Sequence, residues 1–230
     1  MNIVYALTRN VYEQLLPSVT SLVKHNKNAK IFIVCEDDKF PYELPKKCTV
    51  INISGQTWFE KDSVNYNNPY SYINLLKVCY PTLLNCDKVI HLDIDTIICG
   101  SLRGLWDTDV RGKWFAACPE YKGWYKPFGD VYYNMGVALI NLAQMRKDKA
   151  QDRLVEYLNG FCQPWADQDA WNEIAIQEDK ATAFELKYNE NFATGKTDEP
   201  VIVHYCGVND WYTNRNMFRR EYLDEYLSER

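Results

Sequence analysis

The sequence predicts an α/β fold in which a β-sheet carries helices on both faces. Short runs rich in branched apolar residues alternate along the chain with longer runs whose apolar residues recur at helical spacing. No repeat, low-complexity tract or Pro/Gly/Ser-rich linker divides the 230 residues. Hydrophobic residues make up 47% and charged residues 25%, which fits a globular chain with a sizeable core and excludes disordered and fibrous proteins. We therefore expect residues 1–230 to form a single domain.

The individual elements follow in chain order. Residues 2–7 (NIVYAL) predict a buried strand, and residues 11–26 place apolar side chains at helical spacing before a polar Asn-Lys-Asn turn. Further strands are predicted at 30–35, 49–53, 89–93, 96–99, 114–117, 133–141 and 201–205. Further helices are predicted at 70–86, 148–159 and 167–178, with a charged helix from about residue 215. Residues 55–69 are polar and irregular, which predicts a loop at the active site.

Charge, hydropathy and cysteine usage narrow the function classes. The net charge of −5 lacks the basic surplus typical of nucleic-acid-binding proteins, so we expect no nucleic-acid partner. No stretch approaches the ~18 apolar residues of a membrane span, and the first residues lack the basic segment of a signal peptide. None of the 8 cysteines forms a Cys-x-x-Cys pair. We therefore expect reduced thiols in a cytoplasmic protein, without a zinc site or disulfides.

The strand pattern also predicts where a ligand would bind. In sheets of this class ligands sit beyond the carboxyl ends of the strands, which here means residues 7–12, 93–95 and 204–207. No G-x-G-x-x-G fingerprint and no G-x-x-x-x-G-K-[ST] loop is present. Their absence argues against dinucleotide-dependent oxidoreductases and P-loop enzymes.

The best chemical signal is Asp93-Ile94-Asp95, which directly follows an apolar strand. Residues i and i+2 of a strand point the same way, so Asp93 and Asp95 should project together while Ile94 turns into the core. Two carboxylates on one side suit Mn²⁺ or Mg²⁺, ions that can neutralise a nucleotide diphosphate. The same spacing at 107/109 lies in a polar turn and predicts a solvated loop instead.

A histidine is the candidate third ligand of this ion. His204 follows the apolar run 201–203, so it is expected at the carboxyl end of another strand. Imidazole nitrogen and carboxylate oxygen together suit a divalent transition metal. A structural histidine, satisfied by neighbouring hydrogen bonds, is the alternative at this position.

Together these segments resemble glycosyltransferase family 8, the group that contains glycogenin and the bacterial lipopolysaccharide galactosyltransferases. The similarity covers nearly the whole chain in five ordered segments: 6–12 (ALTRNVY), 91–96 (HLDIDT) with its continuation 100–112, 133–142 (YNMGVALINL), 167–172 (DQDAWN) and 204–207 (HYCG). They are similar to the family's uridine-binding segment, its Asp-x-Asp segment, its Asn-Ser/Ala-Gly-Val strand, its Asp-Gln-Asp-x-x-Asn helix start and its metal-binding His-x-x-Gly.

The resemblance implies a GT-A fold, which is Rossmann-like, with a mixed, mostly parallel central sheet flanked by helices. It implies retaining transfer of a hexose, glucose or galactose, from a UDP-sugar to a glycan, protein or other hydroxyl acceptor. The implied cofactor is Mn²⁺, with Mg²⁺ as the alternative, held by Asp93, Asp95 and His204. The implied nucleotide-sugar-binding residues are Leu7, Thr8, Asn10, Tyr12, Lys77, Asp93, Ile94, Asp95, Asn134, Asp167, Gln168 and Gly207. Gln168 and Asp167 are the implied catalytic residues, and Tyr12 is the candidate for stacking on the uracil.

The resemblance departs at two positions. Asn74 and Asp210 stand where the family usually has cations that grip the donor. Lys77 lies one turn from Asn74 on the same helical face. We expect Lys77 or Arg215 to supply the missing charge, and Asp210 to face solvent or the acceptor.

Other function classes stay open at this point. A nucleotide-sugar-binding homologue with little catalysis would tolerate the loss of both cations. A metal phosphohydrolase would explain Asp93 and Asp95, but neither 133–142 nor 167–172. No motif identifies the acceptor or the oligomeric state. We expect the acceptor near loops 56–68 and 121–130, whose stacking candidates are Tyr121, Trp124, Tyr125 and Phe128.

Overall fold

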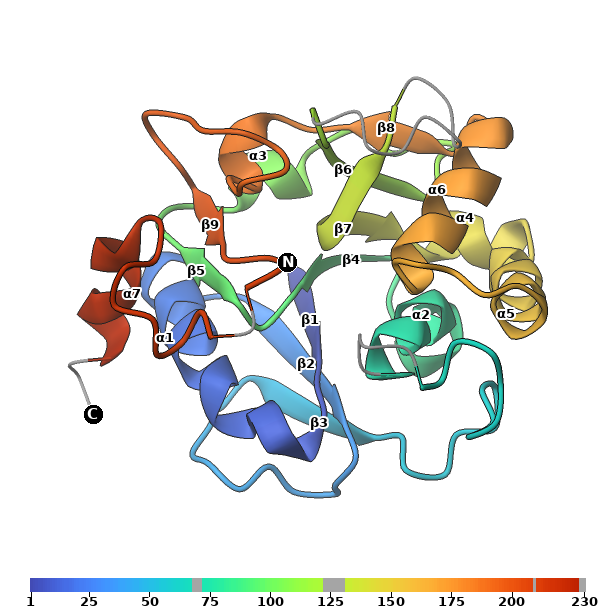
Figure 1. Cartoon of the computed structure of the whole chain (residues 1–230), viewed down its shortest axis with the longest axis horizontal. Helices are drawn as coiled ribbons and strands as arrows, with labels where there is room; N and C mark the ends of the chain where they lie inside the picture. The colour runs from blue at the N-terminus through green and yellow to red at the C-terminus, as the bar shows by residue number, and fades with distance from the viewer. Residues whose placement is uncertain (68–71, 122–130, 209, 228–230) are drawn as a thin grey trace.

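A mixed β-sheet runs through the centre of the molecule between two groups of helices (Figure 1). The computed structural model describes residues 1–67, 72–121, 131–208 and 210–227. Over these residues the sheet has seven strands in the order β3-β2-β1-β4-β7-β6-β8. The strands are β1 (Asn2–Ala6), β2 (Lys30–Cys35), β3 (Cys48–Asn52), β4 (Lys88–Leu92), β6 (Phe115–Pro119), β7 (Tyr133–Asn141) and β8 (Ala181–Ala183). Only β7 among them runs against its neighbours, β4 and β6. The predicted α/β fold with a mostly parallel, mixed sheet is therefore confirmed.

The helices form two groups on either side of this sheet (Figure 1). One group contains α1 (Leu15–His25), which continues the 3₁₀ turn η1 (Arg9–Gln14), and α7 (Arg220–Leu227) packed beside it. The other contains the 3₁₀-helix η2 (Tyr72–Cys79), α2 (Tyr80–Leu83), α4 (Leu142–Lys147), α5 (Ala150–Gly160) and α6 (Asp167–Gln177). With both faces covered, β1 and β2 read as continuous apolar runs instead of alternating ones. Within the described part of the chain, no helix has the length and apolar character needed to cross a bilayer.

Two short strands form a second sheet beside the first. β5 (Thr96–Ile98) pairs antiparallel with β9 (Ile202–His204), in a register that places Thr96 opposite His204. Ile97 and Val203 of this pair belong to a small apolar cluster that also contains Tyr205, Trp211, Leu223 and Tyr226. The pairing therefore brings the C-terminal part of the chain against the segment that follows Asp93–Asp95.

Several elements differ from the sequence prediction for local reasons. The predicted helix 70–86 is a 3₁₀-helix from Tyr72 followed by the short α2, which has Pro81 in its first turn. Proline suits a first helical turn because its missing N–H would have no partner there. The C-terminal helix begins at Arg220 instead of about 215. α4, β8, α3 (Arg103–Trp106) and the 3₁₀ turn η4 (Leu186–Tyr188) were not predicted.

The strand order determines where a ligand can bind. The chain adds β2 and β3 on one side of β1 and then crosses to place β4 on the other side. Such a change of direction opens a crevice at the carboxyl ends of the two strands. Because β7 is antiparallel to β4, the start of β7 meets the end of β4 at this same edge, where the backbone N–H of Asp93 donates to Gly136 O over 2.7 Å.

Candidate active site

A cavity of about 440 Å³ lies at this edge of the sheet. Its size is within the range of small-molecule sites. All of the sequence-predicted metal ligands and nucleotide-sugar residues line it except Tyr12, together with Ala6, Val11, Ile73, Asn74, Glu120, Gly136, Trp165, Phe192, Ala193, Cys206, Val208 and Trp211. The structure thus brings together residues from both ends of the chain.

Tyr12 does not reach the cavity. Its side chain is only 4% exposed, and its ring centroid lies 4.7 Å from that of Phe40. Its hydroxyl donates to Asp37 over 3.0 Å. The turn η1 directs Thr8, Asn10 and Val11 toward the cavity and Tyr12 into the molecule. The geometry therefore offers no support for stacking of Tyr12 on a uracil.

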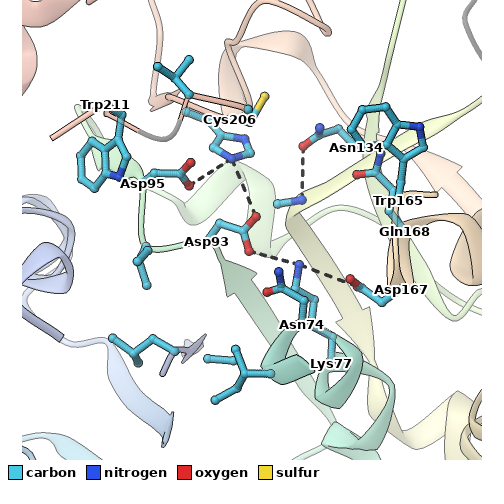
Figure 2. Close-up of a pocket in the computed structure, with 18 of the residues that line it drawn as sticks. Asn74, Lys77, Asp93, Asp95, Asn134, Trp165, Asp167, Gln168, Cys206 and Trp211 are labelled. Carbon is cyan, nitrogen blue, oxygen red and sulfur yellow. Dashed lines mark hydrogen bonds and ion pairs between the residues drawn. The ribbon is translucent and has the colours of Figure 1, made fainter. Parts of the chain in front are cut away.

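Asp93, Asp95 and His204 form one cluster. The dashed lines from Asp93 and Asp95 to the imidazole ring in Figure 2 mark the ion pairs of these carboxylates with His204. His204 Nε2 lies 3.3 Å from Asp95 Oδ1 and 3.8 Å from Asp93 Oδ2. β4 ends at Leu92, so the two acids converge within the turn between β4 and β5 and not by strand alternation. Ile94, predicted to turn into the core, packs partly buried against the core and also lines the cavity.

The cluster fits a divalent cation. His204 Nε2 is buried and has no hydrogen-bond partner among the described residues, although two carboxylates face it. One ligand atom from each residue can be chosen so that all lie within 4.8 Å of one another. Two carboxylate oxygens and one imidazole nitrogen form a donor set that suits Mn²⁺.

The two oxygens of Asp93 face different neighbours. Oδ1 lies 2.9 Å from His91 Nε2 and 3.1 Å from Lys77 Nζ, and Oδ2 is directed at His204. Burial alone would raise the pKa of Asp93, but the Lys77 ammonium and the two histidine rings lower it below its usual range. Burial lowers the pKa of His91 to about 4, so its ring is neutral. Because the ionised carboxylate only accepts, His91 Nε2 donates to it and the Tyr80 hydroxyl can donate to Nδ1.

Lys77 provides a buried positive charge in the cavity. Its ammonium lies between Asp93 and Asp167, 3.7 Å from Asp167 Oδ2 (Figure 2). Burial raises the pKa of Asp167 to about 7, despite the opposing effect of Lys77. Asn74 and Lys77 both line the cavity, since residues three apart share a face of a 3₁₀-helix. Arg215 and Asp210 are exposed and lie outside the lining.

Amide side chains form the opposite wall. Gln168 Oε1 accepts from the Met135 N–H over 2.9 Å, and its Nε2 lies 3.3 Å from Glu120 Oε1. Asn134 Nδ2 donates to the same Glu120 oxygen over 2.9 Å. Burial raises the pKa of Glu120, while hydrogen bonds from Asn134 and Gln168 oppose that effect. Glu120 therefore holds both amides in place.

Sequence reasoning missed Glu120, Trp165 and Phe192. Glu120 directly follows β6, so the strand-end rule could have identified it. Trp165 and Phe192 are 37% and 51% exposed at the cavity, but they follow no regular element and no pattern marks them. Of the predicted acceptor loops, residues 68 and 122–130, including Trp124, Tyr125 and Phe128, lie outside the described residues.

The chain is similar in sequence to known glycosyltransferases. The family described as "Glycosyl transferase family 8" matches residues 2–211. A putative glycosyltransferase of Haemophilus influenzae is 27% identical over 92% of the chain and 73% of its own length. Glycosyltransferase GlyA of Streptococcus pneumoniae is 25% identical over 88% of the chain, which spans only 31% of that relative. A lipopolysaccharide 1,2-glucosyltransferase of Escherichia coli is 24% identical over 96% of the chain and 77% of its own length.

Solved structures show the fold. The galactosyltransferase LgtC, in complex with donor and acceptor sugar analogues, matches with a TM-score of 0.74 over 100% of this chain and 96% of its own, at 20% identity. An active-site variant of LgtC matches with the same TM-score of 0.74 at 18% identity. The architecture is the GT-A fold of these transferases.

Proposed function

The chain belongs to glycosyltransferase family 8, and on that premise we propose that it transfers a hexose, with retention of configuration, from a UDP-sugar to a hydroxyl acceptor in a Mn²⁺-dependent reaction. The observation that carries the proposal is the convergence of Asp93, Asp95 and His204 in one cavity with Leu7, Thr8 and Asn10. The buried Nε2 of His204 has no hydrogen-bond partner among the described residues and faces both carboxylates. A relative described as a glucosyltransferase and a similar structure described as a galactosyltransferase support a hexose donor.

Asp93, Asp95 and His204 would hold the ion, with Mg²⁺ as the alternative to Mn²⁺. When bound, a divalent ion there neutralises the diphosphate and stabilises the UDP leaving group as a Lewis acid. Lys77 orients Asp93 through Oδ1 and adds a fixed positive charge beside the site where negative charge develops. Gly207 offers a backbone free of side-chain bulk at the cavity wall.

The remaining residues bind the two ends of the donor. Leu7, Thr8 and Asn10 follow β1 along the chain, line the cavity together with Ile94, and hold the uridine. Asn134, Asp167 and Gln168 lie on the β7 and α6 side and face the sugar. Gln168, fixed by Met135 and Glu120, orients the sugar for attack from the face that the UDP leaves, which retains the configuration without a covalent intermediate.

A second candidate is a nucleotide-sugar-binding homologue with little catalysis. Of the described residues that line the cavity, Lys77 alone is a lysine or arginine. Asp210, which stands where the family usually has a cation, is exposed. A site with one cation fewer would bind UDP-sugars and yet stabilise the departing diphosphate less well.

A donor panel separates the two candidates. The protein is incubated with UDP-glucose, UDP-galactose and UDP-N-acetylglucosamine, with Mn²⁺ and a mixture of candidate sugar acceptors, and released UDP is measured. We expect turnover with one hexose donor, abolished by EDTA and restored by Mn²⁺. Saturable UDP-sugar binding without UDP release would favour the binding homologue. Release of phosphate from simple esters without nucleotide preference would contradict both.

A further inference from the structure

The buried amide of Asn189 contacts the ring of His204 on the side away from the carboxylates. Asn189 follows η4, is 0% exposed, and does not line the cavity. Its Oδ1 lies 2.9 Å from His204 Nδ1, and its Nδ2 lies 3.0 Å from Asn134 Oδ1. The direction of these hydrogen bonds decides which nitrogen of His204 carries the proton when the ring is neutral.

On the Asn134 side of Asn189, a backbone N–H group determines the direction of these hydrogen bonds. The Gly136 N–H, which can only donate, is bonded to Asn134 Oδ1 over 3.2 Å, and Asn134 Nδ2 faces the carboxylate of Glu120. The side-chain oxygen of Asn134 therefore faces Asn189, and the NH₂ group of Asn189 must donate to it. The carbonyl oxygen of Asn189 is left to face His204.

A second neighbour gives the same result independently. Asn191 Oδ1 accepts from the backbone N–H groups of Ala193 and Thr194, at 2.8 and 3.0 Å. Its NH₂ group is then the one that faces Asn189, and it lies 3.0 Å from Asn189 Oδ1. On both sides, backbone N–H groups determine the orientation of the neighbouring amide. The deduced orientation of Asn189 therefore does not depend on an arbitrary choice of amide oxygen and nitrogen.

We propose that Asn189 is a positioning residue, which keeps the proton of neutral His204 on Nδ1 and so presents the lone pair of Nε2 to a divalent ion. The inference rests on the metal site proposed above. Without Asn189, the favourable arrangement would place the proton on Nε2, where it can donate to Asp95 Oδ1, 3.3 Å away. A bound ion would then have to displace that proton. Hydrogen-bond partners behind metal-binding histidines commonly change metal affinity by about 10- to 100-fold.

The first test needs neither metal nor activity. Long-range ¹H–¹⁵N spectra of metal-free protein labelled in its 3 histidines distinguish the two tautomers of each ring, at a pH where His204 is neutral. His25→Gln and His91→Gln variants assign the signals. We expect His204 to carry its proton on Nδ1. A proton on Nε2 in the wild-type protein would overturn the inference.

The second test compares two buried asparagines. Asn26 is 5% exposed, bonds to Gly100 O and to the Leu102 N–H, caps the end of α1 and does not line the cavity. Mn²⁺ titrations followed by electron paramagnetic resonance should show about 10- to 100-fold weaker binding for Asn189→Ala and unchanged binding for Asn26→Ala. In Asn189→Ala the His204 proton should also move to Nε2.

The outcomes separate the inference from the proposed function. Unchanged Mn²⁺ affinity and tautomer in a folded Asn189→Ala protein would contradict the inference alone. Absence of Mn²⁺ binding in the wild-type protein would contradict the metal site, while the spectra still decide the tautomer. If Asn189→Ala does not fold, the wild-type spectra decide.

Discussion

Gly136 is the residue that allows the proposed metal ligands to pack against β7. A Cβ atom added there would lie 2.7 Å from Asp93 Oδ2 and 2.8 Å from His204 Nε2, so both ligands would have to move. Gly136→Ala should therefore weaken Mn²⁺ binding by about tenfold or more while the fold survives. Gly160→Ala is the matched control, because its Cβ would meet no atom of the described residues within 4 Å. Equal Mn²⁺ affinities for the two variants would contradict the proposed ligand set.

The Lys77→Ala variant tests whether Lys77 supplies the positive charge that contacts the donor diphosphate. Charge-assisted contacts to phosphate contribute about 1.5–3 kcal/mol, so Lys77→Ala should lower kcat/KM by about 10- to 100-fold. Arg215→Ala and Asp210→Ala change exposed side chains outside the cavity lining and should leave kcat/KM unchanged. Thermal unfolding of each variant separates loss of activity from loss of fold. A loss for Arg215→Ala as large as that for Lys77→Ala would show that the described cavity omits part of the donor site.

Among single residues, the sequence predicted those whose place follows from a strand end. Asp93, Asp95 and His204 were found because β4 and β9 end beside them, and the structure brings them into one cluster. Asn189 could not be found, since its position depends on the β5–β9 pairing and on a turn with no sequence pattern. Tyr12 was placed by similarity of segments, which does not specify the direction of a side chain in a 3₁₀ turn.

At the scale of elements, Asp148 joins the end of α4 to the residues that directly precede β6 and β8. It accepts from Trp114 Nε1, Lys180 Nζ and Gln144 Nε2 over 2.8, 2.7 and 2.8 Å. Burial opposes ionisation, but the Lys180 ammonium and the two neutral donors lower the pKa of Asp148 to about 2. The carboxylate therefore stabilises the folded state above about pH 4, and this contribution is lost as the pH falls through about 2.

Asp148→Asn should accordingly lower the free energy of unfolding by about 2 kcal/mol at pH 7, and by less at pH 3. Urea unfolding at the two pH values measures the difference. The control is Asp109→Asn. The pKa of Asp109 is also lowered to about 2, by Arg111, but its side chain is 59% exposed. That exposed pair should contribute nothing measurable. An equal cost at both pH values for Asp148→Asn would exclude an ionic origin.

Elements with a strong apolar period were predicted closely, and β7 was predicted with its observed bounds. The errors have physical causes. The run 70–86 carries a helical pattern, but periodicity cannot distinguish a 3₁₀-helix from an α-helix over so few turns. β8 is three residues long and partly exposed, so its pairing with β6 leaves no pattern in the sequence.

At the scale of the whole molecule, the described residues form two separate clusters of buried apolar side chains. The larger surrounds the central sheet, and the smaller lies under α7. The β5–β9 ladder and the ion pair between buried Glu190 and half-buried Arg219 (3.0 Å) connect the C-terminal part of the chain to the rest. We propose that residues 1–230 unfold as one unit.

This proposal predicts coincident urea transitions in far-ultraviolet circular dichroism and tryptophan fluorescence. The fluorescence reports both clusters, since Trp114 and Trp171 lie in the larger one and Trp211 in the smaller. Separate transitions for the two probes would contradict unfolding as one unit.

We propose that Asp93, Asp95 and His204 hold an ion through which a uridine diphosphate is bound. The most direct test of this proposal is calorimetric titration of UDP into the protein with Mn²⁺ and with EDTA, because binding requires no knowledge of the acceptor. We expect saturable binding with Mn²⁺ that is lost in EDTA and strongly weakened in Asp95→Asn. UDP binding of equal affinity in EDTA, or unaffected by Asp95→Asn, would contradict the proposal.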